Sequence, residues 1–146
     1  MFFSKVFLLV CALAAAGTLT ASAQGPQWDY CSGNQYAFSL DSVDIEPYPI
    51  ERGTTTSFSL SGESSITVDE ADISIKIKKG FITVFHTHLN LCDYYQCPVT
   101  EGPVSISLPE SIPSAVPKGK FGFEIDITTP SYTGSVVCVD GEFQVE

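Results

Sequence analysis

Apolar residues recur at every second position along several stretches of this chain. Isoleucine alternates with serine and lysine across 73–78, and phenylalanine and isoleucine alternate with glycine and acidic residues across 121–127. A period of two residues places one set of side chains on the inner face of a half-buried strand. No window of ten or more residues shows the period of a helix. These patterns predict an all-β fold.

Further strands are expected at 38–45, 54–60, 81–89 and 136–145, with a turn at Lys79-Gly80. The nine prolines are expected between strands or at their ends, where a missing N–H does little damage. Short strands separated by frequent turn signals are typical of two packed antiparallel sheets. We therefore predict an immunoglobulin-like antiparallel β-sandwich of about seven strands.

The N-terminus has the pattern of a secretory signal peptide. Lys5 precedes an apolar run over 6–16, and the small residues Ala21-Ser22-Ala23 follow. The run is shorter than the roughly 20 residues that span a bilayer. We expect a signal peptide at 1–23 and one domain at 24–146, either secreted or in the endo-lysosomal lumen.

Four of the five cysteines lie outside this leader, an even number that predicts two disulfide bonds in an oxidising compartment. Four cysteines allow three pairings, of which we expect Cys92–Cys97, a short clip, and Cys31–Cys138, which would join the two ends of the domain. A zinc site at Cys92-x4-Cys97 is the alternative, but no second close cysteine pair accompanies it.

Charge limits the partners. Seventeen acidic residues face seven basic ones, which argues against nucleic acid as a ligand. Lys76, Lys78 and Lys79 form the densest basic cluster, with Lys118 and Lys120 elsewhere. These lysines would either meet phosphate groups or simply keep a strand solvated.

Signs of catalysis are lacking in the sequence. No nucleophile elbow, phosphate-binding loop or paired-histidine metal motif is present. His86 and His88 share one face of a strand and could begin a metal site, but a third ligand is not evident, and two ordinary histidines are the simpler interpretation. A pH-dependent role in docking or release is a further hypothesis for this pair. We expect no enzyme activity, no cofactor and no metal.

Five ordered motifs resemble the ML lipid-recognition domain family. They are Trp28–Cys31, the hairpin Ile75–Ile82, Leu91-Cys92, Cys97–Gly102 and Pro117–Phe121. The chain is most similar to the phosphatidylglycerol/phosphatidylinositol transfer proteins of fungi and protists, and more distantly to the Niemann–Pick lysosomal cholesterol-transfer protein. The resemblance implies a sandwich whose sheets separate to hold an acyl chain or a sterol in an internal apolar cavity.

The inward-facing residues are then candidates for the cavity wall, although ordinary core packing is an equal alternative for each. The wall candidates are Ile73, Ile75, Ile77, Phe81, Phe85, Phe121, Phe123, Ile125 and Ile127. Family analogy places the mouth near the Cys92–Cys97 loop, with Tyr94, Tyr95 and Pro98 as its rim.

The resemblance implies a monomer that binds one phospholipid or sterol and transfers it between membranes or to a partner protein. A carrier of this kind needs transient contact with a membrane or an acceptor protein. Two other functions remain open: a secreted lipid-recognition module without transfer activity, and a secreted hydrolase.

Overall fold

The computed structural model describes residues 25–32 and 35–146, so the expected signal peptide at 1–23 lies outside the described residues. Eight strands and one short 3-10 helix make up the fold. They are β1 (Gln27–Tyr30), β2 (Phe38–Glu46), β3 (Thr55–Ser64), β4 (Asp72–Lys79), β5 (Ile82–Asn90), η1 (Leu91–Asp93), β6 (Gly102–Ser111), β7 (Gly119–Thr128) and β8 (Ser135–Val145). No helix in the described ranges is long and apolar enough to cross a membrane.

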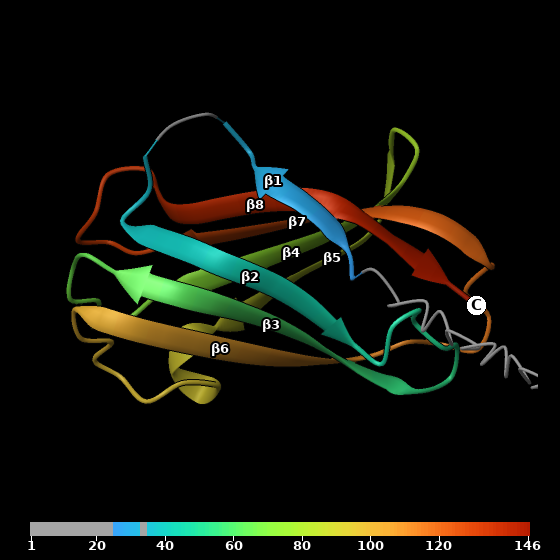
Figure 1. Ribbon diagram of the computed structural model, residues 1–146, viewed down its shortest axis with the longest axis horizontal. Helices are drawn as coiled ribbons and strands as arrows, with labels where there is room; N and C mark the ends of the chain where they lie inside the picture. The colour runs from blue at the N-terminus through green and yellow to red at the C-terminus, as the bar shows by residue number, and fades with distance from the viewer. Residues whose placement is uncertain (1–24, 33–34) are drawn as a thin grey trace, which may run out of the picture.

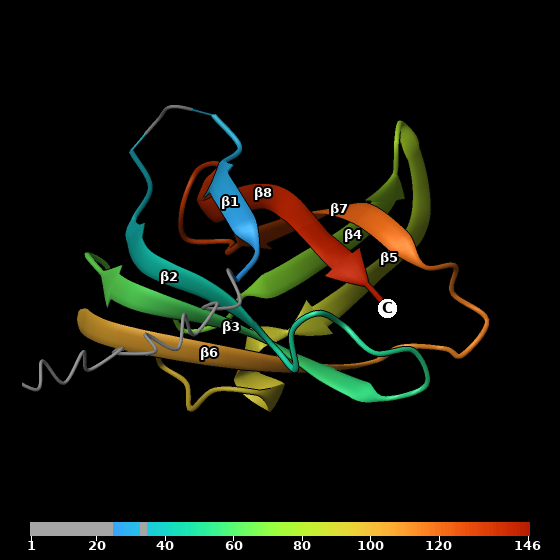
Figure 2. The ribbon, with the colours of Figure 1, turned by 45° about the vertical axis from the view of Figure 1, so that its right-hand side comes forward.

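The strands form two facing antiparallel sheets, which confirms the predicted sandwich (Figures 1 and 2). One sheet has the order β1-β8-β7-β4-β5 and the other has the order β2-β3-β6. The count is eight strands instead of about seven. β1 is only four residues long, and β6 contains Pro103 and Pro109, which were expected outside strands. β6 tolerates both prolines because it is an edge strand.

The two ends of the sandwich differ. At the closed end, where β4, β6 and β8 begin, the loops fold over the core: Val68 pairs with Val99, and Leu91 starts η1 beside them. All three side chains are fully buried. The open end is where β4, β6 and β8 finish and where β5 and β7 begin. No strand partner covers the inner face of β5 there, because β5 is the edge of a five-stranded sheet that faces only three strands.

Both disulfide bonds have the expected pairing. Cys31–Cys138 fastens the end of β1 to β8, and the Cys31 N–H also donates to the Cys138 carbonyl at 3.0 Å. Cys92–Cys97 closes the connection from η1 toward β6. Because both cysteines of the short pair are oxidised to each other, the zinc alternative for Cys92 and Cys97 is wrong.

The loop lengths predict unequal contributions of the two bonds to stability. In the chain-entropy description, a bond across 107 residues contributes about 4–5 kcal/mol, whereas one across 5 residues contributes about 2 kcal/mol. Urea unfolding should therefore show a larger loss of unfolding free energy for Cys31→Ala/Cys138→Ala than for Cys92→Ala/Cys97→Ala. Equal losses would mean that the link between β1 and β8 adds little.

Candidate functional site

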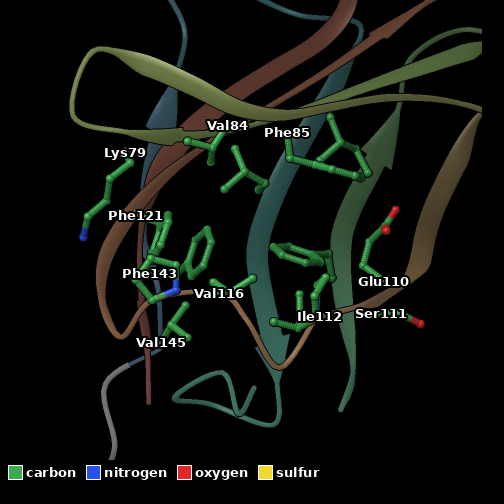
Figure 3. Close-up of a pocket in the computed structure, with 15 residues that line it drawn as sticks. Lys79, Val84, Phe85, Glu110, Ser111, Ile112, Val116, Phe121, Phe143 and Val145 are labelled. Atoms are coloured by element: carbon green, nitrogen blue, oxygen red, sulfur yellow. The ribbon is translucent and has the colours of Figure 1, made fainter. Parts of the chain in front are cut away.

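A cavity of about 310 Å³ lies between the sheets at the open end (Figure 3). Strands of both sheets and the segment after β6 contribute to its wall, and nearly all of the lining side chains are apolar. The lining residues are Phe58, Ile75, Ile77, Lys79, Val84, Phe85, Glu110, Ser111, Ile112, Pro113, Val116, Pro117, Phe121, Phe143 and Val145. Its volume is at the lower end of the range of roughly 300–1,000 Å³ found for small-molecule sites.

A cluster of aromatic rings forms the floor of the cavity. Phe121 and Phe143 stack with their centroids 5.8 Å apart, and Phe58 meets Phe143 edge to face at 6.2 Å. Phe123 lies beneath them, 6.4 Å from Phe58, and is 2 % exposed. Rings from facing sheets thus meet here, so the cavity ends at this cluster and the core beyond it is packed.

The sides of the cavity come from β5, which is the edge of its sheet, and from the β6–β7 connection. Figure 3 shows Val84 and Phe85 of β5 on one side and Ile112 and Val116 of the β6–β7 connection on the other. Phe85 pairs with Ile77 and so faces inward, yet it is 45 % exposed. An inward-facing aromatic ring with this exposure means that the cavity is open to solvent along the edge of β5.

Three polar residues lie at the margin of this apolar surface. Lys79 donates from Nζ to the Lys120 carbonyl at 2.8 Å, and the same Nζ lies 4.5 Å from the centre of the Phe121 ring. Glu110 and Ser111 end β6 on the other side of the view in Figure 3.

Glu110 continues the inward-facing series of β6 after Ile106 and Leu108. Its carboxylate makes no hydrogen bond or ion pair with another described side chain, and burial raises its pKa. Its cross-strand neighbour Thr56 is fully buried, and the Thr56 hydroxyl also lacks a partner among the described residues. The inner face of this sheet therefore changes from apolar to polar at the mouth of the cavity.

The structure places the twelve predicted site residues in four different regions. Ile75, Ile77, Phe85 and Phe121 line the cavity. The other inward-facing residues of β4 and β7 do not reach it and are packed core: Ile73, Phe123, Ile125 and Ile127. They face inward as predicted. Ile73 and Ile127 lie toward the closed end, whereas Phe123 and Ile125 lie level with the cavity-lining Ile77 and Ile75 but one strand further from the β5 edge.

The remaining four predicted residues do not line the cavity either. Phe81 lies at the turn between β4 and β5 and is fully exposed. Tyr94, Tyr95 and Pro98 follow η1 at the closed end, so the structure does not bring the expected rim to the mouth. The physical reason is that β5 runs from the open end to the closed end, which separates the Cys92–Cys97 loop from the cavity by the length of that strand.

Sequence reasoning also missed several lining residues. Phe58 and Phe143 lie in predicted strands, and their inward position followed from the same alternation that identified Phe121. Ile112 and Val116 belong to an irregular segment that gives no periodic signal. Only the paired prolines around them, Pro113 and Pro117, marked the segment as structured.

The other chemically notable residues have local partners. His86 bonds Ser74 at 3.0 Å, and His88 lies 2.8 Å from an Asp72 carboxylate oxygen. Both histidines are exposed on the outer face, and no group of three or more metal-ligating side chains occurs in residues 25–32 and 35–146.

Two of the clustered lysines are ion-paired on the outer face. Lys76 and Lys78 contact the two carboxylate oxygens of Glu124 at 3.3 and 3.2 Å. Partial burial opposes ionisation of Glu124, but these two lysines outweigh it and leave the pKa of Glu124 lowered. Lys76 and Lys78 thus have a structural partner and point away from the cavity.

The sequence over residues 25–145 matches the family model described as ML domain. The chain belongs to the ML domain family. A putative phosphatidylglycerol/phosphatidylinositol transfer protein 2 of Dictyostelium discoideum is 29 % identical over 126 residues, which cover 84 % of this chain and 87 % of that protein. A phosphatidylglycerol/phosphatidylinositol transfer protein of Aspergillus fumigatus is 30 % identical over 128 residues, covering 80 % of this chain and 71 % of that one.

Solved structures show the same fold at low sequence identity. A Niemann-Pick type C2 protein from the Japanese carpenter ant superposes with a TM-score of 0.65 at 12 % identity, covering 82 % of this ML domain chain and 99 % of that one. Chicken MD-1, complexed with lipid IVa, gives a TM-score of 0.54 at 15 % identity, covering 80 % and 87 %. The fold of this chain is therefore that of ML proteins.

Substitution by tryptophan should separate the open half of this ML domain from its packed half. Ile77→Trp places its extra atoms in the cavity, so we expect little loss of stability. Ile125→Trp must enlarge a side chain that is 0 % exposed and packed on all sides, and should cost about 1–3 kcal/mol or more. Thermal unfolding followed by circular dichroism measures both; equal destabilisation would argue against free space beside Ile77.

Glu110→Gln should change how stability depends on pH. A carboxyl whose pKa is raised by folding contributes stability that is present below its unfolded pKa and is lost as pH rises through the folded pKa. The glutamine variant should therefore be more stable than the parent near pH 7, by less than about 1 kcal/mol because the group is partly solvated, and equally stable near pH 3. Urea unfolding at both pH values tests this, with the exposed Glu63→Gln as control. A gain that persists at the acidic pH would contradict the explanation.

Proposed function

We propose that this protein binds a single lipid, a phospholipid or a sterol, in the cavity at its open end and transfers it between membranes or to a partner protein. The observation that carries this proposal is the cavity itself: an apolar space between two sheets, closed at one end by aromatic rings and open at the other. Such a shape suits a hydrocarbon chain whose polar end stays in water.

The cavity volume limits how much of a lipid it can hold. A dry apolar cavity of roughly 150 Å³ binds one benzene molecule. A cavity of about 310 Å³ therefore has room for ~12 carbon atoms, which is a segment of one acyl chain or a comparable part of a sterol. At ~0.8 kcal/mol per buried CH₂, such a chain gains up to ~10 kcal/mol relative to water.

The gain of free energy relative to water also applies to a membrane, so exchange between cavity and membrane is favoured. The interior of a bilayer is also free of water, so moving a chain from bilayer to cavity changes its hydration very little. Because the free energy of the chain is similar in the bilayer and in the cavity, a protein that takes up lipid in this way can also release it. Water then remains the main barrier between two membranes, and a carrier lowers this barrier by enclosing the chain.

The comparisons support a lipid as ligand. Two relatives of similar length are named phosphatidylglycerol/phosphatidylinositol transfer proteins, and chicken MD-1 was solved with lipid IVa. Two disulfide bonds are typical of proteins in an oxidising compartment, which supports secretion or an endo-lysosomal location.

Lipid content and transfer can be measured separately. Organic extraction of the purified protein followed by mass spectrometry should recover about one lipid per protein molecule. Fluorescent phospholipid or sterol should then move between donor and acceptor vesicles faster with the protein than without it. Ile77→Trp, which fills the cavity, should lower both the amount of recovered lipid and the transfer rate at least tenfold. Tyr94→Ser, at the closed end, should lower neither.

The outcomes distinguish the three functions. Bound lipid without accelerated transfer would indicate a recognition module instead of a carrier. Turnover of a lipid ester would indicate a hydrolase. Absence of any bound or bindable lipid would overturn the proposal.

A further inference from the structure

The hairpin between β4 and β5 presents large apolar side chains to solvent. Phe81 is 106 %, Ile82 69 % and Val84 54 % exposed. In both ribbon views the turn projects beyond the neighbouring strands (Figures 1 and 2). Apolar side chains gathered at a projecting turn mark a contact site more often than chance exposure does. We call these three residues the apolar tip.

The local backbone holds the apolar tip away from the core. Gly80 adopts a φ of 62°, a conformation that favours glycine, and so reverses the chain immediately before Phe81. The register then shifts between Ile77 and Lys78, which leaves Val84 as an extra residue on β5. Because the facing sheet does not extend to β5, no part of the sandwich covers these side chains.

The apolar tip is continuous with the cavity. Val84 belongs to both, and its neighbour Phe85 lines the cavity while being 45 % exposed. Val84 and Phe85 therefore connect the end of the hairpin to the wall of the cavity. A hydrocarbon chain could move along this route without crossing water, provided that the tip itself lies in an apolar medium.

Charge is distributed unevenly between the two ends. Every lysine and arginine of the described residues lies on β4, the start of β7 or loops at the open end. These residues are Arg52, Lys76, Lys78, Lys79, Lys118 and Lys120. Arg52 is placed there by its bond to the Val116 carbonyl, at 3.5 Å.

At the closed end the described Asp and Glu residues have no Lys or Arg beside them. These acidic residues include Glu63, Asp69, Glu70, Asp72, Asp93 and Glu101. Arg52, Lys79 and Lys118 have no carboxylate partner among the described residues, whereas Lys120 contacts Glu142 at 2.8 Å. Glu46, Glu51, Glu110 and Glu146 also lie near the open end, so that end is roughly balanced in charge, and attraction to anionic phosphates would orient the molecule more than it would hold it.

We propose that the apolar tip is a docking surface for a lipid bilayer, which it enters so that the cavity opens toward the membrane. Insertion of Phe81, Ile82 and Val84 supplies the adhesion, and the uneven charge turns the open end toward the phosphates. The projecting shape favours a deformable lipid surface over a protein partner, which would need a matching groove. This proposal adds a specific membrane contact to the proposed function. Docking itself does not require that the cavity binds lipid, but the purpose given to it here rests on the proposed function.

Vesicle flotation tests the proposal. The purified protein is mixed with phosphatidylcholine vesicles, with or without phosphatidylglycerol, and the floated fraction is measured. Phe81→Ser/Ile82→Ser should reduce partitioning into both kinds of vesicle about tenfold or more, because two exposed apolar side chains are lost. Tyr94→Ser, which alters an exposed aromatic residue at the closed end, is the matched control and should float like the parent.

Two further measurements distinguish loss of docking from unfolding of the variant and from loss of lipid binding. Circular dichroism should show that the double variant is folded, and Phe81→Ser alone is the second variant if it is not. Lipid recovered by extraction should be unchanged in the variants, since the proposed cavity is intact; a protein that floats but holds no lipid would contradict the proposed function and leave docking supported.

Unchanged flotation of the folded tip variants would overturn the docking proposal. It would also be overturned if the parent fails to float but forms a dimer that the tip substitutions dissociate in sedimentation velocity, because the apolar tip would then bind a second copy of the chain.

Discussion

Three strands cannot cover the inner face of five, and this mismatch determines where the protein is hollow. At the closed end, loops make up the difference: Val68, Leu91 and Val99 fill the space at the ends of the strands. At the open end no equivalent segment of the described ranges covers β5, so its inward side chains border an empty volume. The interior of a protein is normally close-packed, and an apolar void open to water is stable only because the packed remainder carries the fold.

The sequence was sufficient to predict six of the eight described strands and the inward face of β4 and β7. Alternation in β4 and β7 identified which isoleucines and phenylalanines point inward, and the described structure agrees for each of them. The disulfide pairing was also predicted correctly. Two strands were missed: β1, which is only four residues long, and β6, where Pro103 and Pro109 were taken as interruptions although a missing N–H is tolerated at a sheet edge.

The site was predicted less well, for a physical reason. A period of two residues tells which face a side chain occupies, but not how far along the strand the two sheets separate. Ile75 and Ile127 have the same pattern in sequence, yet only Ile75 borders the cavity. The distance between sheets depends on strand order, on widths and on loops such as 112–118, which leave no periodic trace. Family analogy placed the mouth near the Cys92–Cys97 loop, whereas the cavity that the described residues form lies at the other end of the sandwich.

The aromatic floor has a consequence for how such a protein can change over evolutionary time. Phe58, Phe121 and Phe143 lie between the open part of the cavity and the packed core. Substitutions on the open side of this cluster change the shape of the cavity, while those in the packed core change the stability of the fold. A scaffold built in this way can therefore vary its cavity while its packed core is retained.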